Sequence, residues 1–336
     1  MRAVIWTGPG RLEVVDKPVP AVVEGHSLVR VELAGLCATD RELVSGAIPG
    51  AVIGVTPGHE IVGTVVTSLE PMDTPVGTRV VVDTVFGCGD CASCRAGEFS
   101  ICAHPQELGY TADGGWAEFV LVKNSHLYAI PDSLDASAAV LCEPFAMPFG
   151  SLLHSGEPVA GRSVFIVGSG VAALGFVAGA VALEAGSVDV SLRVAERIPV
   201  FTAVDPRVVV SLGSDRTAPD GGFDISVDTV GSTASIRAAI AAVRPGGHVM
   251  AYGLREQDVD FPLADVVIRN IRLAGYVNPP RAWPAFMERV AQGDIPLAGL
   301  VDRRITIEEV PEAVTNWGSN LRTAIDFGAD QEGGWG

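Results

Sequence analysis

The sequence predicts an α/β protein that combines a mostly β domain with a doubly wound parallel sheet. In roughly the first 130 residues, short β-like runs separated by Gly and Pro are typical of a compact β-rich domain. After Pro144 continuous apolar strands alternate with helical stretches, which indicates a parallel sheet with both faces covered. At 168–173 a glycine turn joins the first of these strands to a helix of small residues.

The apolar runs place the expected elements in order. The strands of the β-rich part are LVRVELAG (28–35), EIVGTVVTSL (60–69) and GTRVVVDTV (77–85). The later strands are SVFIVGSG (163–170), VDVSLR (188–193), PRVVVSLG (206–213), FDISVDTVG (223–231) and GHVMAYG (247–253). Helices are expected after the glycine turn, at 235–243 and at 283–292. The link from 213 to 223 is too short and polar for a full crossover helix, and the tail 328–336 is expected to be frayed.

The composition is that of a folded, acidic protein. The chain is 48% hydrophobic and 19% charged, which argues against disorder. A net charge of −17 without a basic patch argues against nucleic acid and anionic membranes as partners. The start, MRAVIWTG, resembles a strand rather than a signal peptide, so a cytoplasmic protein is expected. Residues 164–183 carry no charge and could span a membrane by length, but their glycine turn favours a buried strand, turn and helix.

Four of the six cysteines form a cluster with the spacing Cys88-x2-Cys91-x2-Cys94-x7-Cys102. Four thiolates on a short loop suit tetrahedral zinc with a closed, structural ligand shell. An iron–sulfur cluster uses related spacing and is the alternative metal group. Because Gly, Asp and Ser stand between the cysteines, an exposed metal-binding loop is favoured over four unconnected buried thiols.

The cysteine spacing resembles the structural-zinc lobe of the medium-chain dehydrogenase/reductase family, the zinc alcohol dehydrogenases. Three further segments resemble the same family in the same order: GLCATD (35–40), PGHEIVGTV (57–65) and VGSGVAALG (167–175). Its polyol, threonine and cyclitol dehydrogenase branch is most similar, through LCEP (141–144) and ELGYTADGGWAEF (107–119). The resemblance covers essentially the whole chain.

The resemblance implies a two-domain organisation. A GroES-like catalytic domain would comprise 1–145 and 280–336, with the zinc lobe at about 86–104, and a Rossmann domain would comprise 146–279. It also implies two zinc ions per chain, one catalytic and one structural. Because members of the family are dimers or tetramers, a homodimer or homotetramer is expected.

The resemblance assigns three ligands to the catalytic zinc. Cys37 and His59 match the family's first two ligands, and Glu143 matches the third ligand of polyol dehydrogenases. Cys142 is the alternative third ligand, since alcohol dehydrogenases place a cysteine there. Glu60 is expected as a fourth ligand that binds reversibly or as a neighbour of the site. Three protein ligands leave a position for water or substrate, which catalysis requires.

The resemblance also implies a route for the substrate's proton. Thr39 matches the family's relay hydroxyl, but the next relay position, a histidine in many relatives, is Glu42. Glu42 could relay through water, or the path differs. Near the C-terminus NLRTAIDFG (320–328) resembles the segment whose arginine reaches the cofactor pyrophosphate and pairs with the aspartate of the catalytic loop. The corresponding residues are Arg322 and Asp40, and Asp40 is expected to orient the site.

The cofactor turn follows the pattern GxGxxA and is formed by Gly168, Gly170, Val171 and Ala173. Its position between a strand and a helix is the context that dinucleotide binding requires. The second strand ends near Leu192 without the acidic residue that binds the ribose of NAD, and Asp189 lies too early. Ser191, Arg193 and Arg197 suit a 2′-phosphate, so NADP is favoured over NAD. Alternatively, Arg193 is a solvated surface charge and the enzyme is unselective.

Together these features predict a zinc-dependent dehydrogenase that moves a hydride between NAD(P) and an alcohol or polyol, or its carbonyl product. One alternative is an NADPH-dependent carbonyl reductase of a biosynthetic pathway, which NADP preference would favour. A second is a nucleotide-binding protein of the same fold without redox turnover. The joint presence of Cys37, His59, Glu143 and Thr39 argues against that second alternative. The substrate stays open among polyols, amino alcohols, cyclitols and simple aldehydes.

Overall fold

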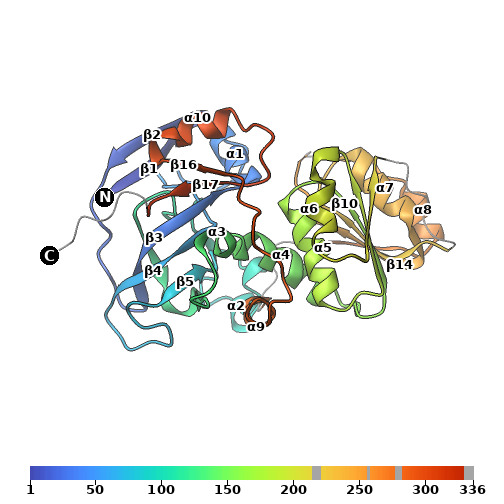
Figure 1. The fold of residues 1–336 in the computed structure, drawn as a ribbon, viewed down its shortest axis with the longest axis horizontal. Coiled ribbons are helices and arrows are strands. Elements are labelled where there is room, and N and C mark those ends of the chain that lie inside the picture. The colour runs from blue at the N-terminus through green and yellow to red at the C-terminus, as the bar shows by residue number, and fades with distance from the viewer. Residues whose placement is uncertain (214–220, 256–257, 277–281, 329–336) are drawn as a thin grey trace. The chain divides into compact units, whose positions relative to one another are not determined.

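The computed structural model describes residues 1–213, 221–255, 258–276 and 282–328. The chain forms two compact units, shown in Figure 1. The first comprises residues 1–143 and the segment from Leu297 onward, and the second comprises residues 144–296. Each unit contains its own large sheet, so each has its own hydrophobic core.

The first unit is built on a seven-stranded sheet with the order β16-β17-β3-β4-β5-β9, in which β8 also pairs with β3. Its strands are β3 (His26–Leu36), β4 (Ile61–Ser68), β5 (Arg79–Val82), β8 (Phe119–Lys123), β9 (Leu127–Ala129), β16 (Arg303–Ile305) and β17 (Thr323–Asp326). Two smaller antiparallel pairs are β1 (Arg2–Gly8) with β2 (Arg11–Asp16) and β6 (Val85–Phe86) with β7 (Gln106–Glu107). The antiparallel pairing of β17 with β3 joins the last described strand to the first domain.

Short helices complete the first unit. They are α1 (Ala38–Ser45), α2 (Ala92–Arg95), α3 (Ala136–Ala139), α10 (Val310–Thr315) and the single turns η1 (Phe99–Ile101), η2 (Asn124–His126) and η4 (Ile307–Glu309). The core lies on the inner face of the sheet, where Val29, Ile61, Val65 and Trp116 are at most 1% exposed. Burying each such side chain contributes about 1.5–3 kcal/mol, which holds the strand ends that carry the candidate ligands.

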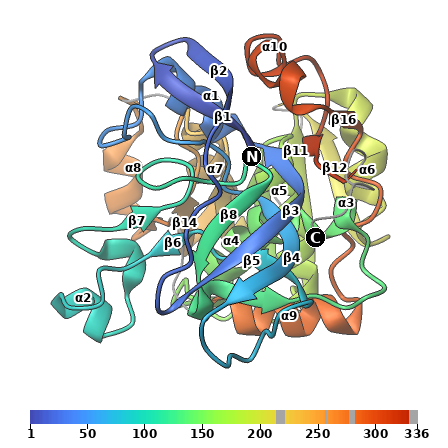
Figure 2. The same ribbon diagram turned by 90° about the vertical axis from the view of Figure 1, so that its left-hand side faces the viewer.

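The second unit has a six-stranded parallel sheet with the order β12-β11-β10-β13-β14-β15. Its strands are β10 (Ser163–Val167), β11 (Ser187–Leu192), β12 (Val208–Leu212), β13 (Phe223–Asp228), β14 (Val243–Ala251) and β15 (Arg272–Gly275). Its helices are α4 (Cys142–Leu153), α5 (Val171–Ala182), η3 (Ala195–Arg197), α6 (Ile198–Thr202), α7 (Thr233–Ala242), α8 (Leu263–Ile268) and α9 (Ala282–Gln292), and Figure 2 shows them from a second direction.

This strand order is that of two mononucleotide-binding halves, which meet where β10 lies beside β13. Because nucleotides bind outside the carboxyl ends of the strands at such a reversal, the turn after β10 is the expected cofactor position. The predicted fold class, a β-rich GroES-like domain with a Rossmann sheet, is confirmed. The predicted link without a crossover helix (213–223) falls largely, and the tail beyond 328 falls wholly, outside the described residues.

The end of the second unit differs from the predicted boundary at residue 280. The helix α9 groups with the second unit, which extends to residue 296. The reason is packing: the ring of Phe286 in α9 lies 5.8 Å from that of Phe149 in α4, centroid to centroid. The fully buried Trp283 packs against Phe286 as well. The chain therefore returns to the first unit only after this apolar helix has been covered.

The uncharged stretch 164–183 is divided into β10, a glycine turn and the twelve-residue helix α5. A Cβ on Gly175 would lie 2.9 Å from Pro148 Cγ, and one on Gly179 would lie 3.2 Å from Phe149 Cα. The GxxxG pattern therefore serves the close packing of α5 on α4. By length and composition, one other stretch, 136–153, could cross a membrane, and 78% of it is buried within the described structure.

Candidate metal and cofactor sites

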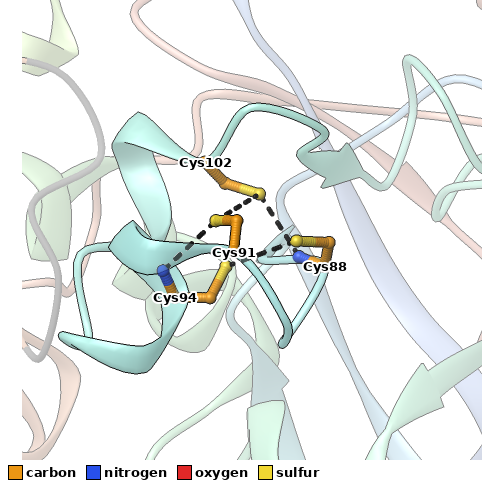
Figure 3. Close-up of side chains that lie close together, drawn as sticks. All are labelled: Cys88, Cys91, Cys94 and Cys102. Carbon is orange, nitrogen blue, oxygen red and sulfur yellow. Dashed lines mark hydrogen bonds between the residues drawn. The ribbon is translucent and has the colours of Figure 1, made fainter.

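The four clustered cysteines bring their sulfur atoms together in a lobe formed by the loop after β6, α2 and η1 (Figure 3). The Sγ atoms all lie within 4.8 Å of one another. Cys88 Sγ is 3.8 Å from Cys94 Sγ, and Cys91 Sγ is 3.9 Å from Cys102 Sγ. A tetrahedral zinc ion with bonds of about 2.3 Å to sulfur requires sulfur–sulfur distances of about 3.8 Å. The donor set and its spacing therefore fit a four-coordinate zinc.

Backbone N–H groups of the lobe stabilise two of these thiols as thiolates. The N–H of Cys94 donates to Cys91 Sγ at 3.4 Å, and that of Cys88 donates to Cys102 Sγ at 3.3 Å. These bonds lower the pKa of Cys91 to about 6 and lower the pKa of Cys102. The side chain of Asp90 raises the pKa of Cys88 to about 12. Four thiolates together therefore need a cation, and the thiolate is the form that binds metal.

A second group of metal-ligand atoms lies at one end of the paired strands β3 and β4. The ligand atoms of Cys37, His59 and Glu60 all lie within 4.8 Å of one another. Cys37 follows β3 as the N-cap of α1, and the other two residues directly precede β4. Because Ala34 pairs with Ile61 in the antiparallel ladder, the two ends meet side by side. A thiolate, an imidazole and a carboxylate are all ligands of catalytic zinc, so this group also fits the metal.

Two glycines leave the space that this group occupies. A Cβ on Gly35 would lie 1.9 Å from Glu60 Oε2. Gly58 has φ +95°, and a Cβ there would lie 2.3 Å from the indole ring of Trp116. The indole Nε1–H of Trp116 donates to the carbonyl of Gly35 at 3.1 Å. The glycines of GLC and GHE are thus required by close packing as well as by backbone conformation.

His59 lies between two oxygen atoms that face its Nδ1. The hydroxyl of Tyr110 is 2.8 Å from this nitrogen, and Asp40 Oδ1 is 3.3 Å from it. Burial by itself would lower the pKa of His59, but the nearby Asp40 carboxylate raises it well above its usual value. Asp40 Oδ2 accepts the backbone N–H of Cys37 at 2.7 Å. Asp40 therefore contacts both Cys37 and His59, and its orienting role stays a prediction.

Arg322 pairs with a different carboxylate from the one expected. Its Nη1 lies 2.8 Å from Glu60 Oε1 and donates to the carbonyl of Leu36 at 2.7 Å. The predicted partner, Asp40, is occupied by the N–H of Cys37 and by His59. Glu60 and Arg322 are at most 5% exposed, so their charges compensate each other inside the domain.

The predicted third ligand, Glu143, lies in the first turn of α4 and is not part of the close group. Burial raises its pKa to about 8, and it interacts electrostatically with His59 and Glu60. The alternative ligand, Cys142, is completely buried, and burial raises the pKa of its thiol to about 12. In this structure Glu143 is therefore near the site, and Cys142 is an uncharged residue of the core.

The two predicted relay residues lie on the exposed side of α1. Thr39 Oγ1 is 3.5 Å from Cys37 Sγ, so its hydroxyl reaches the ligand group. Glu42 follows one helical turn later, and both side chains are exposed. Residues three apart on a helix are neighbours, so this arrangement leads from the ligand group toward water.

Two further residues near the ligand group carried no predicted role. Tyr110 and Glu107 belong to the segment after the cysteine lobe, and Glu107 forms a ladder pair with Val85. Burial raises the pKa of both side chains, and Glu107 interacts electrostatically with His59. The segment ELGYTADGGWAEF contributed to the family resemblance, but neither spacing nor composition indicates that these side chains face the ligands.

The glycine turn after β10 has the geometry of a phosphate-binding loop. Gly168 has φ +147°, and a Cβ there would lie 2.0 Å from Thr229 Oγ1. Gly170 is the N-cap of α5 without a side-chain capping bond, and Val171 begins the helix. Ala173 is fully buried at the contact of helix and strand. The uncapped N–H groups at this helix end are those that bind a pyrophosphate, so the residues fit the cofactor.

The three residues predicted at a 2′-phosphate have different contacts. The hydroxyl of Ser191 donates its one hydrogen to the carbonyl of Gly213, so it offers no donor to a phosphate. Arg197 Nη1 donates to the carbonyl of Ser169 in the glycine turn at 2.6 Å. Arg193 directly follows β11, and its side chain is exposed. In this structure the hydroxyl of Ser191 is bonded to Gly213, and Arg193 is the exposed cation of the set.

Comparison with known proteins gives matches along most of the chain. Residues 23–132 match the alcohol dehydrogenase GroES-like domain, and residues 167–292 match the zinc-binding dehydrogenase domain. The chain is 30% identical to L-threonine 3-dehydrogenase of Streptomyces avermitilis over 314 residues, covering 88% of this chain and 89% of that protein. It is 26% identical to sorbitol dehydrogenase of Bacillus subtilis over 327 residues, covering 94% and 92%.

A solved structure from Sinorhizobium meliloti, described as a zinc-binding dehydrogenase bound to NADP, has the same fold. It superposes with a TM-score of 0.89 at 27% identity, covering 97% of this chain and 98% of that one.

Proposed function

The chain belongs to the zinc-dependent medium-chain dehydrogenase/reductase family. On this basis we propose a role for each of its candidate site residues. The protein is a zinc-dependent oxidoreductase that transfers a hydride between NAD(P) and an alcohol or polyol, or the corresponding carbonyl compound. The observation that carries the assignment of its centre is the convergence of Cys37, His59 and Glu60 within 4.8 Å.

We propose that Cys37 and His59 hold the catalytic zinc and that Glu143 is the third ligand. Zinc, when bound, withdraws charge from the substrate oxygen, and the nicotinamide ring exchanges the hydride. Cys142 is the alternative third ligand, but its side chain is completely buried in the core, whereas Glu143 interacts electrostatically with His59 and Glu60. Glu60 is engaged by Arg322 through Oε1, so it either lends its second oxygen as a reversible ligand or balances the charge beside the site.

The proton of the substrate alcohol is proposed to leave along α1. Thr39 takes it at Oγ1, and Glu42 passes it to water from the next turn of the helix. The 3.5 Å distance from Thr39 to the sulfur of Cys37 and the exposure of both relay residues support this route. A carboxylate in the place of the usual histidine would still supply a proton acceptor at neutral pH.

The cofactor is proposed to be bound at the turn of Gly168, Gly170, Val171 and Ala173, with NADP preferred over NAD. The exposed guanidinium of Arg193 after β11, where no acidic residue stands, supports a 2′-phosphate contact. Arg197 would hold the turn itself through Ser169. The NADP of the Sinorhizobium meliloti structure supports the same preference. Arg322 is proposed to reach the pyrophosphate, as the family resemblance implies.

For the substrate we propose a polyol or amino alcohol rather than a simple alcohol. The relatives named for sorbitol and L-threonine support this class. Glu143 and Glu107 add half-buried carboxyl groups near the ligand group, which would accept hydrogen bonds from a second hydroxyl or an ammonium. A carbonyl reductase working in the opposite direction is the second candidate, because NADPH commonly supplies biosynthetic reductions. The competition of 1,2-diols against matched mono-alcohols tests this preference.

A homodimer or homotetramer is proposed for the assembly. The edge strand β15 has paired backbone groups on one side only within the described sheet. Leu263, Val267 and Ile268 of α8 are each more than 60% exposed, which supports a covered apolar surface. All six cysteines lie in described segments and are unpaired, which fits the reducing conditions of a cytoplasmic protein.

The deciding experiment is the zinc content per chain of the wild-type protein and of the variants Cys37→Ser and Cys91→Ser. Two zinc ions, of which Cys37→Ser loses one without loss of fold, are expected. A single ion that Cys37→Ser keeps and Cys91→Ser loses would refute the proposed catalytic centre. Hydride transfer from NADP(H), followed by cofactor absorbance, separates an active enzyme from a nucleotide-binding protein without turnover.

A further inference from the structure

We propose that Tyr110 is a positioning residue for His59: its phenol oxygen accepts the Nδ1–H, which leaves Nε2 unprotonated and directed to zinc. This inference rests on the proposed catalytic centre. A histidine that binds zinc through one ring nitrogen needs a partner for the other, since that partner fixes the tautomer and the orientation of the ring. In this chain the partner is a tyrosine from the segment that follows the cysteine lobe.

The distances favour the hydroxyl over the carboxylate as that partner. Tyr110 Oη lies 2.8 Å from His59 Nδ1, within ordinary hydrogen-bonding distance. Asp40 Oδ1 lies farther from the same nitrogen, at 3.3 Å, and acts on His59 mainly through its charge. Asp40 instead uses Oδ2 to accept the N–H of Cys37. Asp40 thus supports the backbone of Cys37 and places its charge beside His59, and Tyr110 is the group at hydrogen-bonding distance from the ring nitrogen of His59.

The direction of the hydrogen bond follows from the chemistry of the imidazole ring. A neutral imidazole has one hydrogen and one free lone pair. If the phenol donated to Nδ1, the hydrogen of His59 would lie on Nε2 and that atom could not bind a metal. If Nδ1–H donates to the phenol oxygen, Nε2 keeps its lone pair. When Tyr110 is hydrogen-bonded to Nδ1 in the metal-binding state of His59, the phenol oxygen is therefore the acceptor.

The packing holds Tyr110 firmly in this place. Its side chain is 4% exposed and belongs to an apolar cluster with Trp6, Leu43 and Val55. Leu43 is part of α1, the helix that Cys37 caps, so the ring of Tyr110 touches the element that carries the first ligand. A tyrosine has few side-chain torsions to freeze, and its ring is fixed here on several sides. The hydroxyl is consequently presented to His59 in one position.

The backbone before Tyr110 is fitted to the backbone before His59. Gly109 has φ +90°, and a Cβ there would lie 2.9 Å from the nitrogen of Gly58 and 3.0 Å from its carbonyl oxygen. Any larger residue at 109 would push the two segments apart. Because each glycine immediately precedes one member of the Tyr110–His59 pair, this close approach sets the distance between hydroxyl and imidazole.

The chain offers a matched control in its second unit. The hydroxyl of Tyr276 lies 3.2 Å from Nε2 of the buried His248 and donates to the carbonyl of Ser155. Neither Tyr276 nor His248 belongs to either group of metal-ligand atoms found in the described residues. Tyr276→Phe therefore removes a tyrosine–histidine hydrogen bond of the same kind without touching a proposed zinc site.

The experiment compares zinc affinity in the wild-type protein, Tyr110→Phe and Tyr276→Phe, by competition with a chromophoric chelator. Loss of a hydrogen-bond partner of a zinc-bound histidine typically weakens the metal by about tenfold to a hundredfold. We expect this loss in Tyr110→Phe for the weaker of the two zinc ions only, with wild-type affinity at the cysteine lobe. Tyr276→Phe should leave both affinities unchanged. Equal affinities in all three proteins, within twofold, would overturn the inference.

A failure of the proposed function has a different signature, because the wild-type protein itself would then bind a single zinc ion. If Tyr110→Phe does not fold, NMR can be applied to the zinc-loaded wild-type protein labelled with ¹⁵N-histidine. The spectra show which ring nitrogen of His59 carries the hydrogen. The proposal requires that the Nδ1 of His59 bears the hydrogen and that Nε2 binds the metal. Zinc on Nδ1 would overturn it.

Discussion

The two groups of metal ligands in the first unit are supported in opposite ways. The cysteine lobe takes all four sulfurs from residues 88–102, and the N–H groups that stabilise them belong to the same short segment. The Cys37 group takes three different donors from two strand ends. Its supports come from three separate places: α1, the segment after the lobe and the residue before the C-terminal strand β17.

This difference fits the structural and catalytic roles that we propose for the two groups. Four like thiolates close the coordination shell of zinc, and such a site needs only a compact loop. A site that keeps a position for substrate must hold fewer ligands in place with outside help. Asp40, Tyr110 and Arg322 give that help, each to one ligand or its neighbour. Three sets of variants test this contrast, and a fourth tests the cofactor assignment in the second unit, from the largest expected effect to the smallest.

Cys37→Ser should reduce turnover by about a thousandfold or more, because polarisation of the substrate oxygen contributes several kcal/mol to the barrier. Steady-state oxidation of a polyol with NADP, together with zinc content, measures this loss. Cys91→Ser is the control: it should release the lobe's zinc and speed proteolysis within 86–104, while the other zinc stays bound. Equal loss of turnover in both variants would mean that the two sites depend on each other.

Arg322→Met should destabilise the first unit by about 3–5 kcal/mol, because it leaves the carboxylate of Glu60 buried without its partner. Chemical denaturation gives the free energy of unfolding. The double variant Arg322→Met with Glu60→Gln should recover much of this loss, since no unpaired charge remains. A double variant no more stable than the single one would show that the ion pair is not the cause.

Thr39→Val should slow hydride transfer by about a hundredfold, the usual contribution of a positioned proton-transfer group. Pre-steady-state cofactor absorbance isolates this step. Glu42→Gln should have a smaller effect, because water can replace the second relay member. An unchanged rate in Thr39→Val would rule out the route along α1 and leave the Cys37 group without its proposed proton exit.

Arg193→Ala should weaken NADP binding by about tenfold to a hundredfold, in line with one lost charge-assisted hydrogen bond, and should leave NAD binding nearly unchanged. Fluorescence titration of both cofactors measures the ratio. Ser191→Ala should not alter the ratio of the two affinities, since the hydroxyl of Ser191 already donates to the carbonyl of Gly213. A loss of NADP preference in the serine variant instead would reverse the two assignments.

Local patterns in the sequence were sufficient for several parts of this protein. The lobe of Cys88, Cys91, Cys94 and Cys102 was predicted from spacing, and the turn at 168–173 from its glycine pattern between a strand and a helix. In both, the interacting atoms lie within a few residues. The resemblance to a known family extended this to Cys37 and His59, which the structure brings together. The parallel sheet followed from continuous apolar runs, since strands buried on both faces leave no polar positions.

Contacts between distant segments were not predictable in this way. The sequence suggested Asp40 as the partner of Arg322, but the structure pairs Arg322 with Glu60, 262 positions away. The role of Tyr110 beside His59 and the internal hydrogen bond of Ser191 left no sequence pattern. The sequence by itself thus determined the donor types and their local spacing. Tertiary structure decided the partner of each donor, because partners across the sheet depend on strand register and packing, which no short segment encodes.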